Sequence, residues 1–228
     1  MQGTIHAGRR IALACAVLIA LAGALALSEP ASGHAGSHDS DHAATTGPAK
    51  RAALHDGMRK LWEQHVAWTR LTIVSFAANN PDLPATEARL LRNQTDIGNA
   101  IKPYYGQAAG SELTRQLRAH ILIAADVVLA AKAGDETKLA DAQARWVKNA
   151  DQIAAVLNSV NPRYWPLATM KAEMHMHLKL TTDEAVARLQ GKWTTDVAAY
   201  DKVNRHILHM SDMLSDGIVK QFPSRFAN

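Results

Sequence analysis

An apolar residue at every third or fourth position, sustained from Thr181 to Phe222, constrains the fold of this chain more than any other feature. That spacing builds one face of an α-helix. Thr181 and Glu184 have the spacing of a capping box, so we expect the helix to begin there. Glycine costs about 1 kcal/mol in a helix interior, which makes Gly191 the expected site of any bend. Asp196 falls near the middle of the apolar stripe.

The preceding sequence repeats this pattern in shorter segments separated by helix-breaking residues. We expect helices at about residues 54–78, 86–101, 112–133, 136–160 and 166–178. The breakers between them are Asn-Pro pairs, isolated glycines and Pro103. No alternating pattern typical of strands is present. The sequence therefore predicts an all-α domain, an antiparallel four-helix-bundle-like arrangement of long helices with two extra short helices.

The first 26 residues have the pattern of a secretory signal peptide. Arg9 and Arg10 precede an apolar run from Ile11 to Leu27, and Ala24-Leu25-Ala26 supplies the small residues found before a cleavage site. We expect an exported protein, periplasmic or secreted, with no membrane-spanning segment once the signal is removed. Export by the twin-arginine route and retention of the run as an anchor are the alternatives.

Residues 27–51 are rich in Ser, Ala, Gly and His and show no apolar periodicity. Such a composition cannot bury enough apolar surface to order itself, so we expect a disordered tether that precedes a helical domain at residues 52–228. His34, His38 and His42 recur at four-residue spacing within it. Imidazole ligands at this spacing also suit an arm that collects divalent metal ions.

Cysteine content and charge exclude several functions. Cys15 is the only cysteine and lies inside the signal, so the exported chain has no disulfide, thiolate zinc site, c-type haem attachment or cysteine nucleophile. The net charge is +4, and removal of residues 1–26 with two arginines and no acids leaves +2. This small charge, without a basic stripe carrying aromatics, gives no support for nucleic-acid binding.

Ionisable residues interrupt the apolar faces of three long helices. His65, His120 and Asp196 each lie on the central line of a face, and His177 lies on the flank of another. An unpaired ionisable group is costly to bury, so these side chains must bind one another, a ligand or a metal. The sequence predicts a Zn²⁺, Cu²⁺ or Fe²⁺ site of His65, His120 and Asp196, with His177 as a fourth ligand. A purely structural hydrogen-bonded network is the alternative.

Other patterns give less specific chemistry. His206 and His209 have the spacing of a copper clip near Met210 and Met213, although His209 points outward. A b-type haem held by histidine and methionine needs no cysteine. The sequence lacks a nucleophile elbow, a phosphate-binding loop and the di-iron Glu-x-x-His repeat. We therefore expect a non-catalytic protein that binds a metal ion or small ligand, or alternatively a cell-envelope interaction protein with structural histidines.

Two segments carry a resemblance to known proteins. LLRNQTDIGNAIKPYYG at residues 90–106 and MSDMLSDGIVKQFP at residues 210–223 resemble a family of exported bacterial helical-bundle proteins with no established activity. The resemblance extends over roughly residues 54–226. It implies one exported α-helical domain and assigns no role to any residue.

Overall fold

A computed structural model describes residues 46–228, which are almost entirely helical. In this range the chain forms five α-helices and one 3₁₀-helix, and no strand is present. The helices are α1 (Gly47–Ala78), α2 (Leu83–Ala133), α3 (Glu136–Val160), α4 (Leu167–Leu189) and α5 (Trp193–Gln221), followed by η1 (Pro223–Phe226). The predicted all-α class is confirmed. The predicted signal at residues 1–26 and most of the predicted tether lie outside the described residues.

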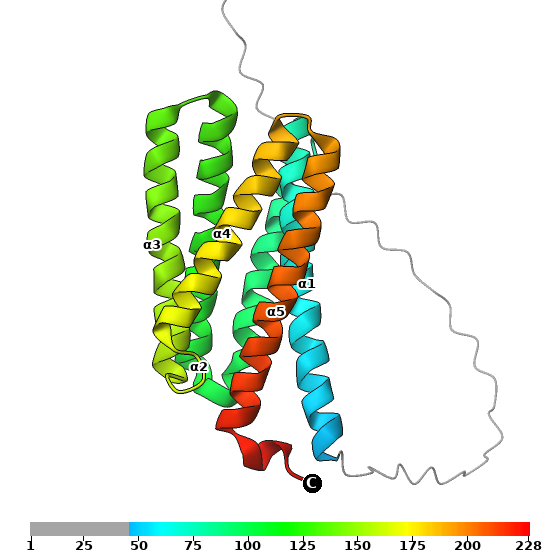
Figure 1. Cartoon of the computed structure of the whole chain (residues 1–228), viewed down its shortest axis with the longest axis vertical. Helices are drawn as coiled ribbons and strands as arrows, with labels where there is room; N and C mark the ends of the chain where they lie inside the picture. The colour runs from blue at the N-terminus through cyan, green and yellow to red at the C-terminus, as the bar shows by residue number, and fades with distance from the viewer. Residues whose placement is uncertain (1–45) are drawn as a thin grey trace, which may run out of the picture. The chain divides into compact units, whose positions relative to one another are not determined.

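Helix α2 consists of two arms that fold back on each other at Gly106, whose φ of 83° and ψ of 170° are not helical. The two arms meet at Gly98 and Gly110, where a Cβ on Gly98 would lie 2.5 Å from the Gly110 carbonyl oxygen. The helical segments therefore alternate in direction along the chain (Figure 1). The expected helix break near Pro103 and Gly106 is confirmed as a reversal of the chain.

The prediction of one long helix from Thr181 to Phe222 is wrong. Gly191 takes a left-handed φ of 68° and turns the chain between α4 and α5, which pack against each other. The expected short helix at residues 166–178 is the first half of α4, so Thr181 lies inside that helix and not at its start. The turn leaves Trp193 and Val197 exposed, although the apolar spacing of residues 181–222 places both on the inward face. The arrangement with two separate short helices is therefore also incorrect.

Helix α1 begins seven residues earlier than its apolar pattern suggests. It starts at Gly47 and not at Leu54, so residues 47–51 are helical rather than part of a tether. The Gly47 amide donates to Asn228 Oδ1 at 2.9 Å, and Arg51 donates to the Phe226 carbonyl at 3.3 Å. Contacts with the far end of the chain thus hold a first turn that local apolar periodicity does not favour.

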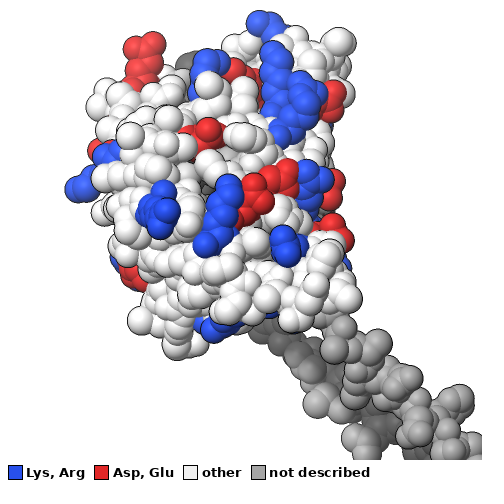
Figure 2. Space-filling view, turned by 60° about the horizontal axis from the view of Figure 1, so that its bottom comes forward, with Lys and Arg blue, Asp and Glu red and all other residues white. Residues whose placement is uncertain are grey.

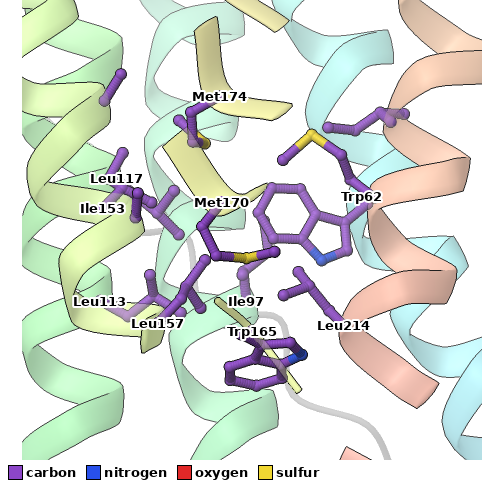
Figure 3. Close-up of a cluster of buried hydrophobic side chains, with 14 of the residues drawn as sticks. Trp62, Ile97, Leu113, Leu117, Ile153, Leu157, Trp165, Met170, Met174 and Leu214 are labelled. Carbon is purple, nitrogen blue, oxygen red and sulfur yellow. The ribbon is translucent and has the colours of Figure 1, made fainter. Parts of the chain in front are cut away.

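The hydrophobic core is formed by side chains from all five helices (Figure 3). Met170 and Met174 of α4 lie at its centre, and Trp62 and Leu214 approach from α1 and α5. Trp165, in the loop before α4, is fully buried. Gly217 leaves room for that indole, because a Cβ there would lie 2.0 Å from Trp165 Nε1. This core fixes the positions of the polar side chains described below.

The face of the domain in Figure 2 carries Lys and Arg side chains interspersed with Asp and Glu side chains. Mixed charge of this kind gives no continuous basic or acidic surface on that face. Within residues 46–228, no helix has the length and apolar character needed to cross a membrane.

Candidate functional site

Three buried histidines from three helices come together in the interior of the domain. His65 of α1, His120 of α2 and His177 of α4 are each 3–4% exposed. The ring centre of His177 lies 5.6 Å from that of His65 and 6.1 Å from that of His120. Trp62 and Trp146 flank the group, at 5.8 Å from His65 and 5.2 Å from His120. We call His65, His120 and His177 the histidine cluster.

Buried amide side chains contact two of the imidazoles, and one of these contacts fixes a tautomer. His120 Nδ1 lies 2.9 Å from Asn149 Oδ1, which can only accept, so His120 carries its proton on Nδ1. Asn149 is itself held by donation to the Gln116 carbonyl at 3.2 Å. Gln94 Nε2 lies 3.2 Å from His65 Nδ1, and the same amide nitrogen also faces the Leu90 carbonyl at 2.9 Å and Asn93 Oδ1 at 3.2 Å. The orientation of each ring is therefore set by a neighbouring helix segment.

Two fully buried ring nitrogens of the cluster have no hydrogen-bond partner. They are His120 Nε2 and His177 Nδ1, both fully buried. Because the His120 proton is on Nδ1, its Nε2 carries a free lone pair that faces the protein interior. Buried polar atoms without partners are uncommon in proteins and call for a physical explanation. Here the unpartnered atoms are of the type that binds transition metals.

All three imidazoles are neutral near pH 7. Burial, helped by the nearby His120, lowers the pKa of His65 to about 3. Burial likewise lowers the pKa of His120 to about 4, although its bond to Asn149 partly opposes this. The pKa of His177 falls well below its usual value because of burial and the surrounding His65, His120 and His206. Neutral imidazole is the form that ligates a metal.

The spacing of the rings is close to that of histidines sharing one metal ion. With Zn–N bonds of about 2.1 Å and tetrahedral angles, two imidazole centres lie about 5 Å apart. The observed 5.6 and 6.1 Å are slightly longer. Within residues 46–228, however, no three His, Cys, Asp or Glu side chains already stand in a geometry that holds a metal ion. Metal binding at the cluster therefore requires rotation of the rings.

A fourth histidine extends the cluster toward the surface. The His206 ring of α5 stacks on that of His177, with 6.3 Å between the ring centres and an angle of 16° between the ring planes. His206 Nε2 lies 3.1 Å from the Glu173 carbonyl oxygen, and its Nδ1 lies 3.7 Å from the Glu173 carboxylate. His209 is mostly exposed and reaches the same carboxylate only at 4.0 Å. The predicted pair His206 and His209 thus contacts a glutamate of α4, which the sequence did not suggest.

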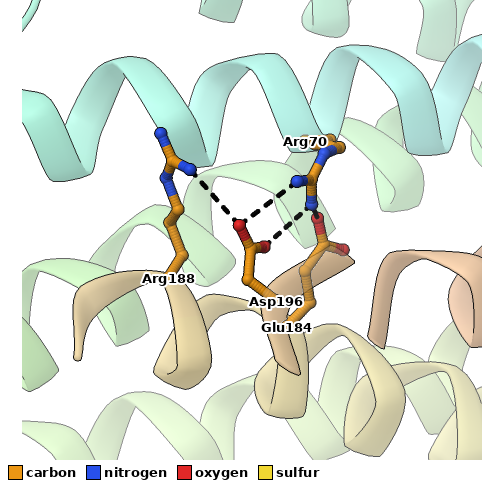
Figure 4. A network of polar contacts seen from close by, with 4 residues as sticks. All are labelled: Arg70, Glu184, Arg188 and Asp196. Atoms are coloured by element: carbon orange, nitrogen blue, oxygen red, sulfur yellow. Dashed lines mark hydrogen bonds and ion pairs between the residues drawn. The ribbon is translucent and has the colours of Figure 1, made fainter. Parts of the chain in front are cut away.

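Asp196 is buried, at 1% exposure, but it pairs with arginines and not with histidine (Figure 4). Its carboxylate accepts from Arg70 at 2.8 and 3.2 Å and from Arg188 at 3.3 Å. Arg70 also donates to Glu184 at 2.8 Å. We call Arg70, Glu184, Arg188 and Asp196 the ionic network. It joins α1, α4 and the first turn of α5.

Aromatic rings and burial complete this network. The guanidinium of Arg70 lies 4.9 Å from the Tyr200 ring centre, and that of Arg188 lies 4.7 Å from the Trp193 ring centre. Glu184 is 1% exposed, and burial raises its pKa to about 7 although Arg70 opposes the shift. These contacts satisfy the charges within the protein itself, so the ionic network stabilises the α4–α5 turn rather than forming an open site.

The sequence located some members of these groups and missed others. His65, His120 and His177 come together as expected, and His177, assigned to a flank, is at the centre. Asp196 lies elsewhere, because the turn at Gly191 places it beside Arg70. Sequence reasoning missed Gln94 and Asn149. Their signal was present, since Gln94 follows Leu90 by four residues and Asn149 follows Trp146 by three, which places both on apolar faces.

Comparisons with protein-family models, with curated proteins and with solved structures each gave no match for this chain. The resemblance to exported helical-bundle proteins therefore stays a prediction. The functional inference rests on the geometry of the described residues.

Proposed function

We propose that this chain is an exported, non-catalytic helical-bundle protein that binds one transition-metal ion, Zn²⁺, Cu²⁺ or Fe²⁺, at the histidine cluster. The observation that carries the proposal is the free lone pair of His120 Nε2, buried among neutral imidazoles from α1 and α4. The hydrogen bond from His120 Nδ1 to Asn149 supports it, because metal-bound histidines commonly donate their other ring nitrogen to a fixed oxygen.

The proposal requires modest rearrangement within the cluster. Ring centres at 5.6 and 6.1 Å are within about 1 Å of the separation expected for shared ligation. The proposal needs a rotation of the His177 ring that turns one of its nitrogens toward His120 Nε2. Asp196 is not a ligand in this proposal, since Arg70 and Arg188 already occupy its oxygens. Water or His206 completes the coordination shell.

The test is to purify the protein without an affinity tag and measure bound metal per chain. We expect about one equivalent after metal supplementation, lost in His120→Ala and in His177→Ala. His175→Ala is the matched control, because His175 lies on the same helix but is half exposed and contacts Asp151. Co²⁺ added to metal-free protein should give visible absorption bands, and metal at 100 times Kd should stabilise the fold by about 2.7 kcal/mol.

Two outcomes contradict this function. Absence of stoichiometric metal, with the thermal midpoint unchanged by chelator and by added Zn²⁺, Cu²⁺ or Fe²⁺, favours the alternative of an interaction protein with structural histidines. A Soret absorption band in protein from haem-replete cells indicates the b-type haem alternative instead.

A further inference from the structure

Glu173 of α4 and the pair His206 and His209 of α5 come together where these two helices pack against each other. His206 and His209 are three residues apart, so they project from neighbouring positions on one side of α5. Glu173 Oε2 lies 3.7 Å from His206 Nδ1, and its Oε1 lies 4.0 Å from His209 Nε2. We call these three residues the outer triad. The metal site proposed above uses neither Glu173 nor His209.

The hydrogen bond of His206 determines which of its ring nitrogens is available. His206 Nε2 lies 3.1 Å from the Glu173 carbonyl oxygen, which can only accept, so the ring carries a proton on Nε2. In the neutral ring, Nδ1 therefore holds a lone pair, and this nitrogen lies beside the Glu173 carboxylate. A cation between a lone pair and a carboxylate is attracted to both. Metal-bound histidines commonly donate their other ring nitrogen to a backbone carbonyl, as His206 does here.

The Glu173 carboxylate lacks the fixed cation that another histidine-bound carboxylate of the domain has. Asp151 lies 2.9 Å from His175 Nε2 and also 2.9 Å from Lys171 Nζ, so a lysine balances its charge. The Glu173 side chain is only 23% exposed, and within residues 46–228 no lysine or arginine nitrogen lies within 4 Å of its carboxylate. A partly buried carboxylate without such a partner is a favourable position for a bound cation.

Distances within the outer triad are close to those between ligands of one metal ion. With bonds of about 2.1 Å and tetrahedral angles, two ligand atoms on Zn²⁺ lie about 3.4 Å apart. The observed 3.7 and 4.0 Å are longer than this by less than about 1 Å. No three ligands within residues 46–228 already stand in metal-binding geometry, so the triad must close slightly around an ion. His209 is mostly exposed, and solvent leaves its ring room to move.

We propose that the outer triad is a second metal site, which binds one divalent transition-metal ion such as Zn²⁺ through Glu173, His206 Nδ1 and a ring nitrogen of His209. Two histidines and one glutamate are an established Zn²⁺ ligand set that leaves a position for water. Mg²⁺ and Ca²⁺ prefer oxygen ligands and do not suit this set. The site is independent of metal at the histidine cluster, where water completes the shell when His206 is bound here. Because the triad is open to solvent, we expect its ion to be lost during purification and regained on titration.

The test counts the Zn²⁺ ions that metal-free protein binds in a calorimetric titration. Glu173→Gln and His209→Ala should each bind about one equivalent fewer than the wild type. Loss of a residue behind a metal ligand already lowers affinity about 10–100-fold, so loss of a ligand should lower it at least as much. Asp151→Asn and His175→Ala are the matched controls and should keep the wild-type count, because they alter a carboxylate–histidine pair that already includes a lysine. Mg²⁺ should give no binding at the triad.

Nuclear magnetic resonance of the imidazole nitrogens locates the ion. In metal-free protein, we expect His206 to show the tautomer with its proton on Nε2. Zn²⁺ should shift the Nδ1 signal of His206 and a ring-nitrogen signal of His209. The Glu173→Gln variant should lack both shifts at the Zn²⁺ concentration that saturates the wild type, and Asp151→Asn should retain them.

Three results would overturn this inference. They are equal Zn²⁺ counts in the wild type, Glu173→Gln and His209→Ala, an unchanged His206 Nδ1 signal at saturating Zn²⁺, and equally tight binding of Mg²⁺. The first two would show that Glu173 forms only ion pairs with the two histidines. The two metal sites fail separately: if only the histidine cluster binds, His209→Ala keeps the wild-type count, and if only the outer triad binds, His120→Ala keeps it.

Discussion

The histidine cluster and the ionic network are neighbouring polar groups in the same domain, yet the cost of burying them is offset in different ways. They share two helices, since Arg70 follows His65 by five residues on α1 and Glu184 follows His177 by seven on α4. In the ionic network, every carboxylate faces a guanidinium. In the cluster, neutral imidazoles leave two fully buried nitrogens without partners.

The difference follows from the charge of the buried group. A buried carboxylate is too costly without a cation, so the fold must supply one. A neutral imidazole costs only an unmade hydrogen bond, which the fold can leave open for a ligand. The internal ion pairs of the ionic network therefore indicate a structural role. The unpartnered ring nitrogens of the histidine cluster indicate a binding role. The following predictions test this contrast.

Among single substitutions, the largest expected effect on stability comes from removal of the Asp196 charge. Asp196→Leu leaves Arg70 and Arg188 without their shared carboxylate, and we expect a loss of about 3 kcal/mol in the free energy of unfolding. Urea denaturation at pH 7 measures it. Asp201→Asn on the same helix is exposed and should change stability by less than about 0.5 kcal/mol. If Asp196→Leu also changes the free energy of unfolding by less than about 0.5 kcal/mol, the ionic network contributes little to stability.

Acid should destabilise the protein through the histidine cluster. The unfolded chain takes up protons near pH 6.5, whereas the pKa values of His65 and His120 in the folded state are about 3 and about 4. The contribution of these two neutral histidines to the free energy of unfolding is therefore fully present above pH 6.5. It is lost as the pH falls toward 4, at up to about 1.4 kcal/mol per pH unit for each histidine. Urea unfolding between pH 7 and pH 4.5 measures the slope. A flat profile would mean that the imidazoles are charged in the folded protein.

Glu184 should act in the opposite direction over the same pH range. Its pKa of about 7 in the folded state lies above its ordinary value of 4.5, so the folded protein binds the proton first. Acidification from pH 7 to 4.5 is stabilising for this one group. Glu184→Gln removes that contribution, and we expect its loss of stability on acidification to be steeper than in the wild type. Glu63→Gln, at an exposed position, should leave the slope unchanged.

The smallest expected effect comes from His177→Leu in metal-free protein at pH 7. This change replaces a neutral ring with an unpartnered Nδ1 by an apolar side chain, so we expect less than about 1 kcal/mol of change in either sign. Urea unfolding beside Asp196→Leu gives the direct comparison. A loss as large as that of Asp196→Leu would show that His177 is structural, and would count against the proposed metal site.

Much of the local structure could be predicted from the sequence. Apolar residues at every third or fourth position predicted helices, and the breakers between them, an isolated glycine at 134 and an Asn-Pro pair at 161–162, predicted the ends of α2 and α3 near the observed places. The same periodicity predicted that His65, His120 and Asp196 are buried. These are local properties, because the face to which a side chain belongs depends only on its position in the helical repeat.

The sequence by itself determined that His65, His120 and Asp196 face inward, and the tertiary structure decided which polar side chains meet. The apolar periodicity of the sequence continues on both sides of Gly191 and indicates at most a bend there. The chain reverses direction at this glycine because α4 and α5 pack against each other. That reversal brings His177 to the centre of the histidine cluster and Asp196 to Arg70. Contacts between residues more than a hundred positions apart, such as Arg70 with Asp196, have no local signature, since they depend on how whole helices pack.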